Sequence, residues 1–134
     1  MALSDIVKEE IKTTGRIIDI KITTYDKAFR NPEKALSKAK NPEAAKQRLY
    51  AIFTVETEEG TIFTETHGVP KGARYNEETG EWEVVDKIAL SRSMDNLNNW
   101  FVQYNAKYKK DPQIGDEVEV KMNERGFLQI VTVR

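Results

Sequence analysis

Two strand patterns separated by a short loop lie in the middle of the chain, and together they predict a β-hairpin. Residues 50–57 and 61–66 are rich in β-branched and aromatic side chains. The loop at 58–60 ends in Gly60, which suits the left-handed position of a three-residue hairpin loop. A two-residue loop would reverse part of the pairing. The side chains predicted to face the core are Phe53, Val55 and Phe63.

Three further segments read as strands. Residues 15–22 alternate isoleucines with charged side chains, which is the period of a half-buried strand. Residues 115–122 alternate in the same way, and 127–133 follow a turn at 123–126. A second hairpin with a Thr-Gly turn and an acidic tip is predicted over 75–85. In the first strand, the side chains expected to face the core are Ile18, Ile20 and Ile22.

The segment between the first two strands, residues 26–49, has a helical and basic composition. Asn31-Pro32 and Asn41-Pro42 each supply an asparagine cap and a proline in first position, so two short helices are predicted. Residues 26–48 contain seven basic and three acidic side chains, a net charge of +4. Long insertions of this kind often carry function. The alternative interpretation of this segment is a solvated helical linker without a function of its own.

Two more helices are expected. Ser4 caps a short amphipathic helix near the amino end, which Gly15 terminates. Ser91 or Ser93 caps a later helix with an apolar stripe, and the stripe makes its tryptophan a core residue. The residues of that stripe are Leu97, Trp100, Phe101 and Tyr104.

The composition excludes several kinds of chemistry. The chain has no cysteine and a single histidine, His67, so it lacks the ligands for a zinc or other transition-metal site. It contains no Gly-x-Ser-x-Gly motif that would present a serine nucleophile. Glu77 and Glu81 could be taken as a catalytic pair, but they lie on an exposed hairpin with no pocket predicted around them. We therefore expect no catalytic residues, no metal and no cofactor.

The 134 residues fit one domain, 1–134. No apolar run approaches the length of about 18 residues that crosses a bilayer, and the amino end lacks the order of a signal peptide. A cytoplasmic protein without membrane contact is expected. The net charge of −1 argues against coating of duplex DNA by bulk charge.

The order of these elements is strand, helical insertion, hairpin, helix and a final pair of strands. This order resembles the OB-fold, a five-stranded, partly open barrel. The residues that carry the likeness are 15–20, the hairpin at 50–66, and Ser91-Arg92-Ser93 leading a helix into 115–120. They resemble the small single-stranded DNA-binding proteins of phages and archaea. The fold class implied is mainly β: a five-stranded barrel with a helical insertion between strands 1 and 2 and a helix between strands 3 and 4.

The resemblance implies binding of single-stranded DNA, or RNA, with low sequence specificity and a role in DNA replication, repair or recombination. Such proteins combine a cationic groove with aromatic rings on which bases stack. The candidate nucleic-acid-binding residues are Arg16, Lys21, Tyr25, Lys27, Phe29, Arg30, Lys71, Arg74 and Tyr75. For each aromatic residue, packing of the ring onto the barrel is the alternative, and it is favoured for Phe29.

Two residues are kept apart from this set. Trp82 lies between Glu81 and Glu83, which would repel phosphates, so it is expected to pack across its hairpin or to meet a protein partner. For His67 a structural role is favoured over a base contact. The rival hypothesis is therefore a protein-interaction module, or a structural subunit of a larger complex, that docks through the acidic hairpin and binds no nucleic acid.

Overall fold

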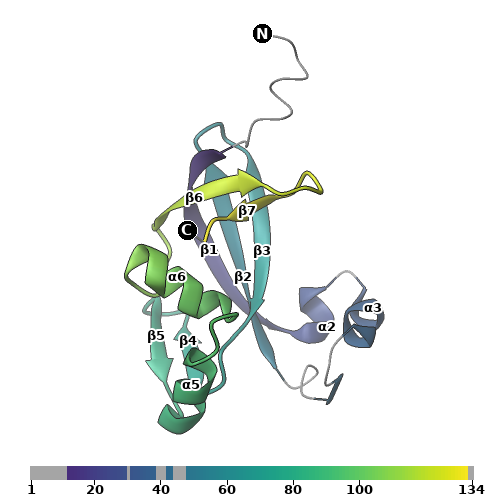
Figure 1. The fold of residues 1–134 in the computed structure, drawn as a ribbon, viewed down its shortest axis with the longest axis vertical. Coiled ribbons are helices and arrows are strands. Elements are labelled where there is room, and N and C mark those ends of the chain that lie inside the picture. The colour runs from purple at the N-terminus through teal and green to yellow at the C-terminus, as the bar shows by residue number, and fades with distance from the viewer. Residues whose placement is uncertain (1–11, 30, 39–41, 44–47, 133–134) are drawn as a thin grey trace.

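The computed structural model describes residues 12–29, 31–38, 42–43 and 48–132, and its main feature is a five-stranded antiparallel sheet. Along the sheet the order is β3-β2-β1-β6-β7, and the sheet curls until β3 and β7 approach each other (Figure 1). At this seam the backbone N–H of Ile130 donates to Oε2 of Glu65 over 3.1 Å. The strands are β1 (Lys12–Thr24), β2 (Leu49–Thr57), β3 (Ile62–Gly68), β6 (Glu117–Met122) and β7 (Leu128–Ile130).

The remaining elements fill two connections. Helices α2 and α3 lie between β1 and β2, whereas the hairpin β4–β5 and helices α5 and α6 lie between β3 and β6 (Figure 1). The predicted mainly β, OB-like barrel with helical segments in these two connections is confirmed. The bounds are α2 (Tyr25–Ala28), α3 (Pro32–Ser37), β4 (Ala73–Asn76), β5 (Glu81–Val84), α5 (Lys87–Met94) and α6 (Trp100–Tyr108).

The hairpin of β2 and β3 has the predicted register. The N–H of Thr57 donates to the carbonyl of Thr61 over 2.8 Å, and Gly60 has a φ of +84°. Val55 therefore lies opposite Phe63. Phe53 and Val55 are fully buried, and Phe63 packs against them at the edge of the core.

Strand β1 differs from the prediction in its inward face. It is longer than expected, and a bulge between Ile17 and Asp19 interrupts its pairing with β2. Two successive residues of β1 then oppose one residue of β2, which shifts the alternation by one position. Ile17 is consequently buried, whereas Ile18, predicted to face the core, is 41% exposed. Ile20 lies inside as predicted, and Ile22 packs against the core from a half-buried position.

The insertion is confirmed in part. Helix α3 starts where Asn31-Pro32 predicted, since Oδ1 of Asn31 accepts the N–H of Lys34 over 3.1 Å. The single turn of α2 was not predicted. The helix expected at Asn41-Pro42 falls largely outside the described residues, as does the helix expected to start at Ser4.

The predicted helix with four apolar residues is in fact two helices. Asp86 caps α5 by accepting the N–H of Ala89 over 3.1 Å, and Asn99 caps α6 by accepting the N–H of Phe101 over 2.9 Å. Asn and Asp side chains bond to nearby backbone and so compete with helix formation. Leu97 lies in the resulting turn and is 79% exposed. The residues of the stripe that pack on the core are Trp100, Phe101 and Tyr104.

The hairpin of β4 and β5 forms as predicted and holds Trp82 against the rest of the domain. The ring of Trp82 lies 4.9 Å from that of Tyr75 across the hairpin and 5.0 Å from that of Phe101 on α6. Its Nε1 donates to the carbonyl of Pro112 over 2.8 Å. The expected packing of Trp82 across its own hairpin is therefore confirmed.

Candidate nucleic-acid interface

The outward-pointing residues of β1, β2 and β3 form one surface, which we call the outer strand face. Because β1 and β3 both pair with β2, these residues lie in rows that cross the three strands. One end of the surface lies beside α2 and the other beside the β2–β3 turn. Starting from the α2 end, the rows are Thr23, Tyr50 and Gly68; Lys21, Ile52 and Thr66; Asp19, Thr54 and Thr64; and Arg16, Glu56 and Ile62.

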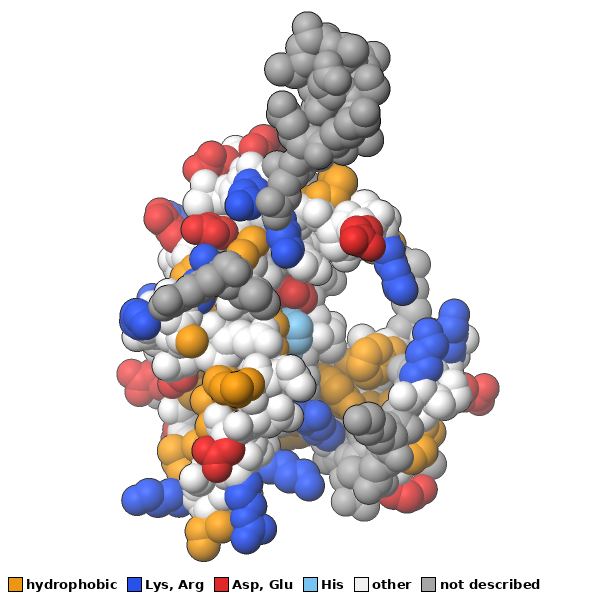
Figure 2. All heavy atoms as spheres, viewed as in Figure 1, with side chains coloured by type: hydrophobic (Ala, Val, Ile, Leu, Met, Phe, Trp, Pro, Cys, Tyr) orange, Lys and Arg blue, Asp and Glu red, His pale blue; other side chains and the backbone are white. Residues whose placement is uncertain are grey.

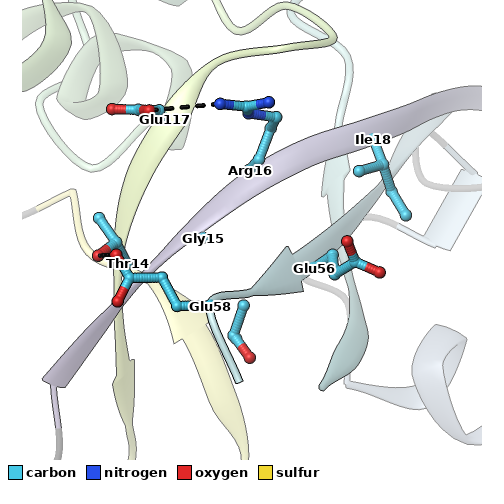
Figure 3. A pocket seen from close by; sticks show the side chains of 8 residues that line it. Thr14, Gly15, Arg16, Ile18, Glu56, Glu58 and Glu117 are labelled. Carbon is cyan, nitrogen blue, oxygen red and sulfur yellow. Dashed lines mark hydrogen bonds and ion pairs between the residues drawn. The ribbon is translucent and has the colours of Figure 1, made fainter. Parts of the chain in front are cut away.

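The end beside the β2–β3 turn is acidic. It contains a pocket of about 330 Å³ whose lining includes Arg16, Glu56, Glu58 and Glu117, and Arg16 points toward Glu117 (Figure 3). Nη2 of Arg16 lies 3.4 Å from Oε1 of Glu117, so this cation is already paired. A phosphate would meet more negative than positive charge here. Arg16, a predicted contact, therefore lies in surroundings that do not suit nucleic acid.

The α2 end has a different character. Its first two rows contain Lys21 and no carboxylate. Lys21 is exposed, and no carboxylate among the described residues lies within ion-pair distance of it. The ring of Phe29 meets that of Tyr50 edge to face, 5.2 Å away, and both rings are half-buried. Phe29 thus packs on the barrel, which is the alternative favoured for it in the sequence analysis. The ring that it packs against is Tyr50, which lies on the outer strand face.

Helix α2 adds charge and one more ring beside this end. Tyr25 is half-buried and Lys27 is exposed. Asp26 lies between them, and the hydrogen bond from the Thr24 hydroxyl lowers the pKa of its carboxyl, so one negative charge accompanies Lys27. Arg30 lies outside the described residues. Figure 2 shows Lys and Arg side chains on the segment of α2 and α3 and along the lower edge of the molecule.

The predicted contacts Lys71, Arg74 and Tyr75 are close in sequence, but the fold gives them different surroundings. Tyr75 is only 6% exposed and belongs to the core, so its predicted role as a stacking platform is wrong. Its burial raises the pKa of its phenol, and the charges of Glu77 and Asp19 add to the effect. Arg74 is bound to Glu83, with 3.0 Å between Nη2 and Oε1. Lys71 is exposed and remains available.

The sequence analysis did not choose Tyr50 or Arg48 as contacts. Tyr50 points outward because Ala51 points inward, a consequence that the hairpin pattern already contained. Arg48 entered only as part of a charge count, although its guanidinium lies over Gly68. No sequence pattern predicts that contact, since it depends on where the pairing of β2 and β3 places Gly68 relative to Arg48.

The β6–β7 turn presents a further aromatic ring. Phe127 is 67% exposed and follows the exposed Arg125. Oδ1 of Asn123 accepts the N–H groups of both residues, which fixes the turn. In an OB-like barrel this turn is one of the loops that flank the binding face.

His67 has a packing role. Its ring stacks on that of Trp100 with centroids 4.1 Å apart and an angle of 12°. Its Nε2 lies 3.2 Å from Oε1 of Glu65, without the alignment of a hydrogen bond. In the parts of the chain that the structure describes, no three His, Asp or Glu side chains are placed to hold a metal ion.

Comparisons with protein-family models, with curated proteins and with solved structures find no match for this chain. Within the described ranges, no helix has the length and apolar character needed to cross a membrane.

Proposed function

We propose that this protein binds single-stranded nucleic acid at the α2 end of the outer strand face. DNA is put ahead of RNA because of the resemblance stated above, which also suggests a role in replication, repair or recombination. We place this role in the cytoplasm as part of the proposal. The protein acts by binding, without catalysis. The observation that carries the proposal is the division of the outer strand face: Tyr50 and Lys21 lie in its two rows beside α2, and those rows hold no carboxylate, whereas Glu56, Glu58 and Glu117 gather with Arg16 at the other end.

The two ends of the outer strand face differ in how they would interact with a nucleic acid strand, which is a polyanion. Bases gain about 1–3 kcal/mol each by stacking on aromatic rings, and every base offers a π-face, so specificity is low. Tyr25 and Tyr50 are the rings proposed for this stacking, and Phe29 packs against Tyr50. Phosphates are attracted to Lys21 and Lys27 and repelled from the pocket around Arg16. A bound strand therefore crosses β1, β2 and β3 near α2.

The test is fluorescence anisotropy of labelled single-stranded DNA and RNA of about 15–30 nucleotides at two salt concentrations, with a duplex as control. Binding that prefers single strands and weakens steeply with salt is the expected result. Absence of binding at low salt, or equal affinity for the duplex, would overturn the proposal.

An interaction module remains the second candidate, because a group of apolar side chains is exposed on β5 and at the start of α5. Val84, Val85 and Ile88 are 61%, 62% and 69% exposed. Trp82, once expected to dock a partner, is held inside the fold, so these three would make the contact instead. Association through them would be insensitive to salt and weakened by Ile88→Ser.

A further inference from the structure

We propose that Arg48 and Lys71 form a binding site for a backbone phosphate of the nucleic acid strand. Both residues line a pocket of about 290 Å³ beside the first row of the outer strand face. The other described residues of the lining contribute apolar side chains and backbone, and none of them carries a carboxylate. The other lining residues are Leu49, Val69, Pro70, Gly72 and Ala73.

The guanidinium of Arg48 is held in place by the backbone of β3 and the residue after it. Nε donates to the carbonyl of Val69 over 3.3 Å, and Nη2 donates to the carbonyl of Gly68 over 3.4 Å. Arg48 makes no ion pair with any described residue. A guanidinium has five N–H groups, so three have no partner among the described residues and can bind an anion. Because its orientation is already fixed, little side-chain entropy is lost when a phosphate binds.

Gly68 makes this placement feasible. It occupies the outward position of β3 in the row of Thr23 and Tyr50. A Cβ at Gly68 would collide with Cζ and Nε of Arg48. The guanidinium therefore lies over the strand on the same face as Tyr50, where any larger side chain would displace it.

The site continues the proposed path of the strand. A base stacked near Tyr50 places its phosphate beside the guanidinium of Arg48, which lies over Gly68 in the same row. Lys71 supplies a second cation to the lining of the same pocket. This assignment rests on the proposed function, and it adds a specific phosphate contact to it.

The experiment measures oligonucleotide affinity and its salt dependence for Arg48→Ala, Arg48→Lys and Gly68→Ala. Each phosphate contact to a single strand contributes about 0.7 to the slope of log K against log salt. We expect Arg48→Ala to weaken binding about tenfold and to lower the slope by about 0.7. Gly68→Ala keeps the charge and moves the guanidinium, so it is expected to weaken binding similarly. Arg48→Lys should fall in between.

Arg74→Ala is the matched control, because it removes the same charge from a side chain already bound to Glu83. It should leave affinity and slope unchanged, and thermal unfolding of every variant checks that it folds. If the natural protein binds and Arg48→Ala binds equally well, the phosphate site is wrong while the proposed function stands. If Gly68→Ala alone binds normally, the fixed placement of Arg48 is wrong. If the natural protein binds no oligonucleotide, both proposals fail.

Discussion

The phenol of Tyr104 donates a hydrogen bond of 2.6 Å to Oδ2 of Asp116, and both side chains are buried. Oδ2 also accepts the N–H of Gln113 over 3.0 Å, while Oδ1 pairs with Lys110. This carboxylate joins α6 to the start of β6. Its partners satisfy a buried charge that would otherwise be costly.

Tyr104→Phe is expected to destabilise the protein by about 2 kcal/mol, because it removes a hydrogen bond to a buried charged group. Tyr75→Phe is the matched control: the Tyr75 hydroxyl is buried and has no hydrogen-bond partner among the described residues. Its removal should be neutral or stabilising. Chemical denaturation of the three proteins measures the difference. Equal effects of the two substitutions would contradict the assignment of the Tyr104 bond.

Stability should fall at alkaline pH in a way that depends on Tyr104. Burial, followed by the hydrogen bond to Asp116 and its charge, raises the pKa of the Tyr104 phenol far above its ordinary value of 10.0. Between the pKa values of the unfolded and folded states, the folded state holds one proton more, so stability declines as pH rises. The difference in unfolding free energy between the natural protein and Tyr104→Phe should shrink by about 1.4 kcal/mol per pH unit above 10. A constant difference from pH 9 to 12 would refute this.

Gly15→Ala is expected to destabilise the barrel by about 1–3 kcal/mol through overpacking. A Cβ there would lie 2.8 Å from Cγ1 of Val55 and 3.0 Å from Cγ2 of Val120. Both valines are buried and cannot move aside. Thr14→Ala is the control, since the neighbouring side chain points away from the core and the substitution removes only an exposed hydrogen bond to Glu58. The measurement is thermal unfolding, and similar melting temperatures for both variants would contradict the tight contact.

The sequence predicts well those features that local chemistry decides. The register of β2 and β3 follows from Gly60 in its loop, and the start of α3 follows from the cap of Asn31. The strand order could be predicted only through the resemblance to a known barrel. The exposure of Ile18 was missed because a bulge depends on the pairing of two strands, which periodicity within one strand cannot reveal.

The candidate site was predicted less completely, for a related reason. Lys21 points outward as expected, because the charge alternates with isoleucines along β1. Arg16 and Arg74 form ion pairs with Glu117 and Glu83, respectively. These pairs depend on the folded structure, so the sequence pattern did not predict them. Gly15 is another case: it was expected to end a helix, and it lies inside β1 between two neighbouring strands.

Lys21 and Arg16 offer a direct test of the two ends of the outer strand face. Both point outward from β1, but only Arg16 is bound to a carboxylate. Lys21→Ala is expected to weaken oligonucleotide binding several-fold and to lower the salt slope by about 0.7. Arg16→Ala should leave both quantities unchanged. If Arg16→Ala has the larger effect, the strand binds at the acidic end and the proposed position is wrong.

Tyr25 and Tyr75 began as equivalent candidates for base stacking, and the fold separates them. Tyr75→Ala removes a ring that is 6% exposed and packed against Trp82, so it should cost about 3 kcal/mol of stability. Tyr25→Ala should change stability much less, because that ring is half-buried on a single helical turn. It should instead weaken binding by about 1–3 kcal/mol. Denaturation and anisotropy on both variants measure the two effects, and a Tyr25→Ala protein that is unstable but binds normally would assign that ring to packing.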